Sequence, residues 1–162
     1  MEIREIKTGK RQYWDLLFLA DEQEEMIEAY LERGVMFVLD DGGVKAECVV
    51  TDEGDGVLEI KNIAVLPEYQ GKGYGKLLII FLEQAYRDSF RILRVGTGDS
   101  PLTIPFYERC GFRESFRRKH FFIEHYDHPI VEGGVLLDDM VYLEKRLTKI
   151  SHCDTMAGTD HE

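Results

Sequence analysis

Apolar and charged residues alternate along the first third of the chain in patterns that predict short elements. The stretch Glu2–Lys7 places apolar residues between charges, which predicts an edge strand. From about Arg11 to Ala20, apolar residues recur at helical spacing, so this segment predicts an amphipathic helix. Asp21, with Glu24 three residues later, is typical of a capped helix start, and Gly34 is expected to end this second helix.

Three strand-like runs follow, at Val35–Asp40, Val44–Thr51 and Val57–Leu66. They are joined by turn sequences, Asp41-Gly42-Gly43 and Glu53-Gly54-Asp55-Gly56. Pro67 is expected to stop the third run, because proline has no amide to give to a strand ladder. The pattern predicts an antiparallel meander.

The second half of the chain mixes helices and strands. It predicts a helix from Gly75 to Ala85, a strand at Ile92–Gly96, a short helix at Phe106–Cys110 that Pro105 starts near Thr103, and final strands at Phe112–Phe116 and Met140–Arg146 around an irregular segment, His120–Gly134. This order predicts an α/β fold with a mixed sheet. We expect one domain over residues 1–147 and a polar, disordered tail over 148–162.

The composition narrows the classes of partner. The chain has 162 residues and a formal net charge of −11, which argues against a nucleic-acid surface, where a basic patch is expected. This acidity is compatible with a cationic substrate, and equally with a charge that only keeps the protein soluble. The chain has no run of about 18 apolar residues and no signal-like start, so we expect no membrane span.

The cysteines indicate a reducing compartment. Cys48, Cys110 and Cys153 are an odd number at wide spacing and form no Cys-x-x-Cys unit, which favours free thiols and a cytoplasmic location. We expect Cys48 and Cys110 to be small core residues rather than nucleophiles.

A glycine-rich junction carries the strongest chemical signal, at Gln70-Gly71-Lys72-Gly73-Tyr74-Gly75-Lys76. It lies between an apolar strand and an amphipathic helix, where free backbone amides and the helix dipole attract anions. Glycines let an anion approach the backbone, and Lys72 and Lys76 add positive charge. The spacing fits neither a P-loop nor the Gly-x-Gly-x-x-Gly dinucleotide pattern. The junction therefore predicts another kind of phosphate or pyrophosphate site.

Two motifs in order resemble one family. Gln70-x-x-Gly73-x-Gly75 is similar to the Gln/Arg-x-x-Gly-x-Gly/Ala signature of the GNAT superfamily of acyl-CoA-dependent N-acyltransferases. Further along, Phe106-Tyr107-Glu108-Arg109-Cys110-Gly111-Phe112 resembles the Tyr-x-x-x-Gly-Phe end of that family's last helix. The likeness covers roughly Glu2 to Leu147, so the chain resembles a GNAT N-acetyltransferase.

The resemblance implies a fold and a cosubstrate. It implies a mostly antiparallel mixed sheet, flanked by helices and splayed between its fourth and fifth strands, with the pantetheine arm of acetyl-CoA in the gap. The backbones of Ile63 and Val65 would pair with that arm, and the amides of Gly71 to Lys76 would hold the pyrophosphate. The cofactor-binding residues expected on this basis are Ile63, Ala64, Val65, Gln70, Gly71, Lys72, Gly73, Tyr74, Gly75, Lys76, Ser100 and Thr103.

The resemblance also implies catalytic roles, in a direct attack of an amine on the thioester within a ternary complex. Tyr107 stands where the family's tyrosine protonates the leaving thiolate; the alternative is a packing residue of an amphipathic helix. Glu59 resembles a catalytic glutamate in position, and strand alternation predicts that it shares a face with Ile63 and Val65. The alternative for Glu59 is a solvated strand residue. The Val65 amide is the implied oxyanion donor.

Two departures from the family pattern affect cofactor contacts. Ser100 stands where an asparagine is common, and its hydroxyl has less reach. Thr103 stands where a small alanine is common. These changes bear on details of the cofactor contact and leave the expected cleft in place.

The acceptor is not defined by the sequence. A small cationic amine and a protein amine both stay open, and relatives imply acceptor-site walls at Asp21, Glu22, Glu24, Glu25 and the His120–His128 loop. We expect no metal and no nucleic acid. The apolar run Met140 to Leu143 and the family's habits favour a homo-oligomer. A non-catalytic acyl-CoA-binding or sensing module is the alternative function, and a pure interaction domain is disfavoured by the glycine junction.

Overall fold

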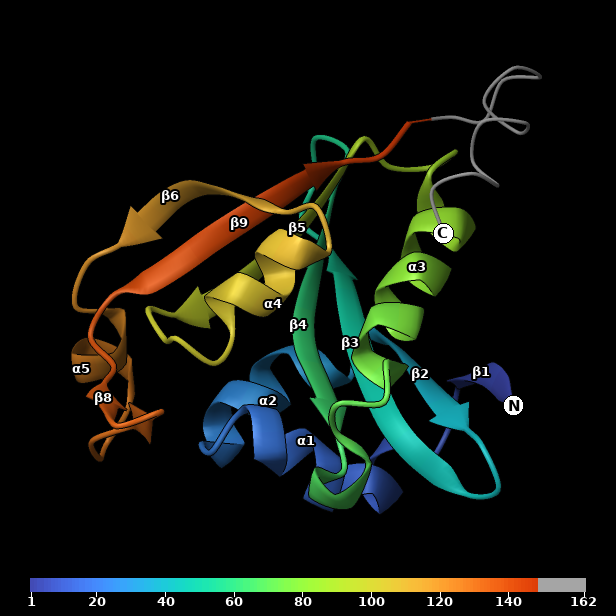
Figure 1. The fold of residues 1–162 in the computed structure, drawn as a ribbon, viewed down its shortest axis with the longest axis horizontal. Helices are drawn as coiled ribbons and strands as arrows, with labels where there is room; N and C mark the ends of the chain where they lie inside the picture. Colours follow the sequence, from blue (N-terminus) through green and yellow to red (C-terminus); the bar gives the residue numbers. More distant parts are fainter. Residues whose placement is uncertain (149–162) are drawn as a thin grey trace.

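One seven-stranded sheet forms the centre of the molecule, in a computed structural model that describes residues 1–148. Its strand order is β1-β2-β3-β4-β5-β9-β6 (Figure 1). The strands are β1 (Glu2–Ile6), β2 (Val35–Asp40), β3 (Val44–Asp52), β4 (Val57–Val65), β5 (Ile92–Gly98), β6 (Arg113–Arg118) and β9 (Met140–Arg146). Neighbours are antiparallel except β4 and β5, which are parallel, so the predicted mixed and mostly antiparallel sheet is confirmed.

Five α-helices in the described part of the chain flank or extend the sheet. They are α1 (Trp14–Ala20), α2 (Glu24–Leu31), α3 (Tyr74–Tyr86), α4 (Ile104–Arg109) and α5 (Phe121–His125), with short 3₁₀ turns at Lys10–Tyr13 and Pro67–Tyr69. The segment expected to be irregular, His120–Gly134, contains α5 and β7 (Val131–Glu132), which forms a small hairpin with β8 (Val135–Leu136) just beyond it. The tail predicted over 148–162 lies outside the described residues, except for Thr148, and the domain boundary stays a prediction.

The predicted cap at Asp21 is wrong. Helix α2 begins at Glu24, and the residue before it, Gln23, makes no side-chain capping bond. The Asp21 carboxylate accepts a 3.3 Å bond from the Gln23 amide and bonds from the hydroxyls of Tyr30 and Tyr126. These tertiary hydrogen bonds use the Asp21 carboxylate, which the local sequence pattern had predicted as the cap of the helix.

The two faces of the sheet bury separate cores. Helices α1 and α2 cover one face, where Leu17 and Ile27 pack against Met36, Val38 and Val49 of the strands. Helix α3 covers the opposite face, in a larger core with the apolar residues Leu58, Ile60, Leu78, Leu82, Leu93, Val95, Tyr107 and Phe112. Because both faces are covered, the central strands carry few exposed side chains.

The sheet opens between β4 and β5. Their pairing spans only Val57–Ile60 against Ile92–Val95, although β4 runs on to Val65 and β5 to Gly98. Beyond this point β4 pairs only with β3, while β5 pairs with β9. Figure 1 shows β2–β4 and β6–β9 running apart at a wide angle. The splay expected between the fourth and fifth strands is confirmed.

A bulge in β4 reverses its alternation. Val49 of β3 pairs with Asn62 and Val50 pairs with Ile60, which leaves Lys61 as an extra residue. Leu58 and Ile60 therefore face α3 before the bulge, and Ile63 and Val65 face α3 after it. Residues on opposite sides of the bulge that are an odd number of positions apart therefore point to the same face, whereas in a regular strand they would point to opposite faces.

The apolar run Met140 to Leu143 is covered by contacts within a single chain. Strand β9 lies between β5 and β6, and its Val141 and Leu143 are fully buried. The exposed edge is β6 instead, all of whose residues are solvent-accessible. The run therefore gives no support to self-association, and the homo-oligomer stays a prediction. Among the described helices, none is both long and apolar enough to span a membrane.

The junction after α4 should be sensitive to loss of volume. Phe112 is 1% exposed and packs its ring edge-on against Tyr107. Phe112→Ala is expected to lower the free energy of unfolding by about 3–5 kcal/mol, because the removed ring leaves a cavity. Chemical denaturation measures this change. Phe116→Ala, at a 40% exposed ring on β6, is the matched control and should cost about 1 kcal/mol. Equal losses for the two variants would contradict the buried position of Phe112.

Candidate functional site

The glycine junction forms an open loop at the end of β4. Gly71 and Gly73 have φ values of 79° and 88°, a region that side chains disfavour, and an added Cβ on either would meet nothing within 4 Å. The loop therefore presents bare backbone. Helix α3 begins directly after it at Tyr74, so the first amides of a 13-residue helix have no carbonyl within that helix.

Contacts on either side hold this loop in place. The Gln70 side-chain amide donates to the Val65 carbonyl at 3.1 Å, which ties the loop to the end of β4. The Tyr74 hydroxyl donates to Asp41 of the β2–β3 turn at 2.6 Å. At Gly75 a Cβ would meet the Phe106 ring at 3.2 Å, so a glycine lets α3 and α4 approach closely. These contacts fix the amides before any ligand arrives.

Tyr107 lies on α4, on the α3 side of the sheet. Its ring is 6% exposed and packs against Phe106 and Phe112. None of the side-chain hydrogen bonds within residues 1–148 involves its hydroxyl. Burial raises the pKa of Tyr107, and the charges of Cys110, Glu132 and Glu47 raise it further. The hydroxyl is therefore protonated near neutral pH and able to donate.

The two hydroxyl residues before α4 have partners inside the protein. Ser100 is 2% exposed, and its oxygen accepts a 3.1 Å bond from the Leu102 amide. Thr103 and Thr97 share a 2.8 Å hydrogen bond between their hydroxyls. Thr97 lies in the part of β5 that no longer pairs with β4. Contacts of Ser100 and Thr103 with a cofactor stay predictions.

The face predicted for Glu59 is wrong. It alternates with Leu58 and Ile60 before the bulge, so it points away from α3, whereas Ile63 and Val65 point toward α3. Its carboxylate lies 2.7 Å from the Lys61 ammonium and 3.8 Å from the Arg94 guanidinium. It also lies where β4 and β5 still pair. The role of Glu59 as a base stays a prediction, and its ion pairs disfavour that role.

Comparisons with known proteins agree with this geometry. The model of the acetyltransferase (GNAT) domain matches residues 32–114. An uncharacterized N-acetyltransferase of Bacillus subtilis, YvbK, is 37% identical over 133 residues, covering 80% of this chain and 86% of that protein. The chain belongs to the GNAT family. It is therefore an acetyltransferase by family.

Solved GNAT structures resemble the chain along most of its length. A GNAT acetyltransferase from Elizabethkingia anophelis, with acetyl-CoA bound, has a TM-score of 0.85 and 32% identity, and the match covers 90% of this chain and 97% of that one. A Bacillus subtilis acetyltransferase in complex with CoA has a TM-score of 0.82 and 33% identity, with 90% and 98% covered. In both cases the match extends over nearly the whole length of the solved chain.

The segments expected to wall the GNAT acceptor site do meet. The Tyr126 hydroxyl donates to Asp21 at 2.8 Å, and the Gln23 side chain exchanges bonds with the main chain of His125 and Asp127, at 2.9 and 3.0 Å. Glu22 lies 3.8 Å from His128. The α1–α2 linker and the His120–His128 segment are thus joined. Glu24 instead faces Arg11 at 3.7 Å, and Glu25 is exposed.

Three buried polar residues near the opening of the sheet were missed. Glu47 in β3 is 0% exposed and Asn62 in β4 is 3% exposed, while Glu132 of β7 is half-buried. Burial raises the pKa of Glu47 and of Glu132. No local pattern marks Glu47, because its burial comes from the helices that cover the central strands.

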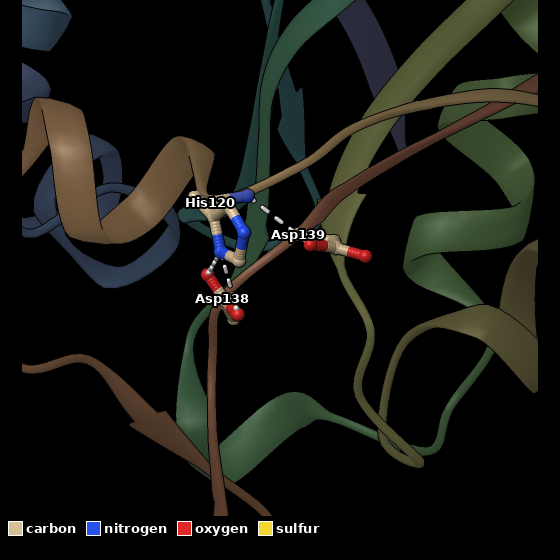
Figure 2. A group of neighbouring side chains, drawn as sticks. All are labelled: His120, Asp138 and Asp139. Atoms are coloured by element: carbon tan, nitrogen blue, oxygen red, sulfur yellow. Dashed lines mark hydrogen bonds and ion pairs between the residues drawn. The ribbon is translucent and has the colours of Figure 1, made fainter.

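A second polar group lies where the chain enters α5. Figure 2 shows the His120 imidazole turned toward Asp138, with Asp139 beside the His120 main chain. The imidazole Nδ1 lies 2.9 and 3.0 Å from the two Asp138 oxygens, and the His120 amide donates to Asp139 at 3.1 Å. Possible ligand atoms of the three lie within 4.8 Å of one another, but Asp139 also faces the Arg117 guanidinium at 3.7 Å. The expectation that the protein uses no metal stays a prediction.

The His120–Asp138 pair should titrate above the ordinary histidine range. Hydrogen bonding to Asp138 and its charge raise the pKa of His120 above its usual value of about 6.5. The pair therefore stabilises the fold at low pH, and this contribution is lost as the pH rises through the raised pKa. An NMR titration of the imidazole measures the shift, and Asp138→Asn should return the pKa toward about 6.5. Identical titration of the two proteins would contradict the contact.

Proposed function

We propose that this chain transfers the acetyl group of acetyl-CoA to a primary amine by direct attack in a ternary complex. The observation that carries the proposal is the gap between β4 and β5, which has the open glycine loop at the end of β4 and the unpartnered Tyr107 hydroxyl on α4. Relatives solved with acetyl-CoA and with CoA support the same cosubstrate.

The cosubstrate would lie along the free edge of β4. In this proposal the Ile63 and Val65 backbones pair with the pantetheine arm, since β4 has no strand partner on that side beyond Ile60. The loop amides and the α3 dipole hold the pyrophosphate, because that end of a helix carries partial positive charge. The proposed binding set is Ile63, Ala64, Val65, Gln70, Gly71, Lys72, Gly73, Tyr74, Gly75, Lys76, Ser100 and Thr103.

Tyr107 would act as the general acid. A neutral amine forms a bond to the thioester carbon, the C–S bond breaks, and the leaving sulfur takes the hydroxyl proton. The proton on the newly bonded nitrogen then restores the tyrosine. The Val65 amide is the proposed donor to the oxyanion, because a fixed amide stabilises charge as it forms.

The acceptor would be a cationic small amine. Asp21, Glu22 and Glu132 lie in the α1–α2 linker and the β7–β8 hairpin, in a chain of net charge −11. Carboxylates attract an ammonium group and repel anionic acceptors. The protein-amine alternative keeps the same chemistry with a larger acceptor. A cytoplasmic location and a homo-oligomer are retained as predictions.

Gly73→Ala should weaken acetyl-CoA binding. A side chain at φ 88° strains the loop, and its Cβ occupies the side from which a phosphate approaches. Calorimetric titration should show a tenfold or greater rise in the Kd for acetyl-CoA, which corresponds to a loss of about 1.4 kcal/mol or more of binding free energy. Gly54→Ala is a matched control, because Gly54 has φ 86° and equally open surroundings in the β3–β4 turn. Equal weakening by the two variants would contradict a pyrophosphate site at the loop.

Tyr107→Phe should separate catalysis from binding. Loss of the hydroxyl is expected to lower kcat by about 10²–10⁴-fold, while acetyl-CoA affinity stays close to that of the wild type. CoA release and calorimetry measure the two quantities. Tyr86→Phe, at a tyrosine of α3 that packs on Phe37 and Phe90, is the control. A wild type that binds acetyl-CoA without releasing CoA to any amine would favour the sensing alternative.

A further inference from the structure

Two side chains beside the open edge of β4 bury polar atoms that the protein leaves unpartnered. Both carboxylate oxygens of Glu47 and the side-chain oxygen of Asn62 have no hydrogen-bond partner among the described residues. Glu47 is 0% exposed and Asn62 is 3% exposed. Burying such groups without partners costs free energy, so a native protein that does so uses them or supplies another partner.

The two residues share one face of the sheet. Glu47 pairs across the ladder with Ala64, and Asn62 pairs with Val49, so they are diagonal neighbours on β3 and β4. Val49 belongs to the core under α1 and α2, which places both side chains on that face. The Asn62 amide is fixed there, because its NH₂ donates to the Leu17 carbonyl at 2.9 Å and to the Tyr30 hydroxyl at 3.0 Å.

Glu47 is close to the proposed reaction centre. Its ladder partner Ala64 lies between Ile63 and Val65, in the part of β4 that β5 leaves free. The charge of Glu47 helps to raise the pKa of Tyr107 on α4 and of Tyr30 on α2, although burial of the two tyrosines is the larger cause. The carboxyl is therefore within electrostatic reach of hydroxyls on both sides of the sheet.

We propose that Glu47 accepts the proton that the acceptor ammonium loses, through a water molecule that also bonds the Asn62 oxygen. This inference rests on the proposed amine acetylation. The carboxylate that the sequence assigned to this role, Glu59, is already paired with Lys61 and Arg94 and faces a closed part of the sheet. The Glu47 carboxylate has no such cation beside it and is free to take a proton.

The proton count closes with Glu47 in this role. The ammonium gives one proton to the Glu47 carboxylate through the water, and the nitrogen lone pair then forms the N–C bond. As the C–S bond breaks, the sulfur takes the Tyr107 proton and the second nitrogen proton returns to Tyr107. Glu47 releases its proton to solvent after the products leave. CoA thiol, amide and one free proton result.

The groups around Glu47 are mostly apolar. Val38 faces it from β2, Ala64 from β4, and the apolar core of α1 and α2 closes that face. The titratable neighbours are Cys48 on its own strand and the hydroxyls of Tyr30 and Tyr107. Burial raises the pKa of Glu47 well above its ordinary value, because apolar surroundings disfavour the charged carboxylate.

The test compares pH profiles of CoA release from acetyl-CoA with saturating putrescine, lysine amide or tyramine. In the wild type, kcat should rise with pH through an ionisation of the ternary complex. Glu47→Gln is expected to lower kcat by about 10²-fold or more and to remove this rise. Its Tm should hold or increase, because the amide avoids a charge that folding buries at neutral pH. Glu47→Asp should keep the rise at a lower rate.

Glu83→Gln is the control, since Glu83 is a half-buried carboxylate that pairs with Lys145 and lies on α3, on the face of the sheet opposite Glu47; its pH profile should match the wild type. A Glu47→Gln enzyme with unchanged kcat and pH profile would overturn the inference and leave the proposed function intact. A loss of kcat in Glu59→Gln, and not in Glu47→Gln, would also overturn the inference. A wild type that binds acetyl-CoA but acetylates none of the amines would overturn the proposed function, and this inference with it.

Discussion

The early end of the β4–β5 ladder is the constraint on which the rest of the structure depends. Pairing stops at Ile60 and Val95, and both strands continue for several residues with one unpaired edge. Exposed backbone of this kind invites another extended partner. In the proposed function that partner is the pantetheine arm of acetyl-CoA. The glycine loop follows the same strand after one short 3₁₀ turn, so one element both opens the sheet and leads to the proposed anion site.

The two cores give the gap different surroundings on its two sides. The α3 side is mostly apolar and carries Tyr107, whose hydroxyl stays protonated because burial raises its pKa. The α1–α2 side carries a polar series that runs from Tyr126 through Asp21 and Tyr30 to Asn62. A donor on one side and acceptors on the other is the arrangement that proton transfer across a thioester attack requires. In the proposed mechanism, the fold thus separates the acid from the base.

Patterns of local origin were predictable from the sequence, whereas patterns set by tertiary contacts were not. The meander, the glycine junction and the helix after it follow from turn residues and periodicity, and they were placed to within a few residues. The face predicted for Glu59 was wrong because the bulge at Lys61 has no local signature in the sequence. The helix cap predicted at Asp21 was wrong because tyrosines distant in sequence donate hydrogen bonds to its carboxylate. Glu47 was overlooked because its burial depends on helices on both faces.

Hydrogen–deuterium exchange with and without acetyl-CoA tests the central claim most directly, because it follows backbone amides one segment at a time. The account predicts slower exchange at residues 63–65 and 71–76 when acetyl-CoA is added. The turn at 53–56, which has a similar glycine backbone, should exchange at an unchanged rate. Protection that spared β4 and the loop, or that appeared only in this control turn, would contradict a cosubstrate site at the opening of the sheet.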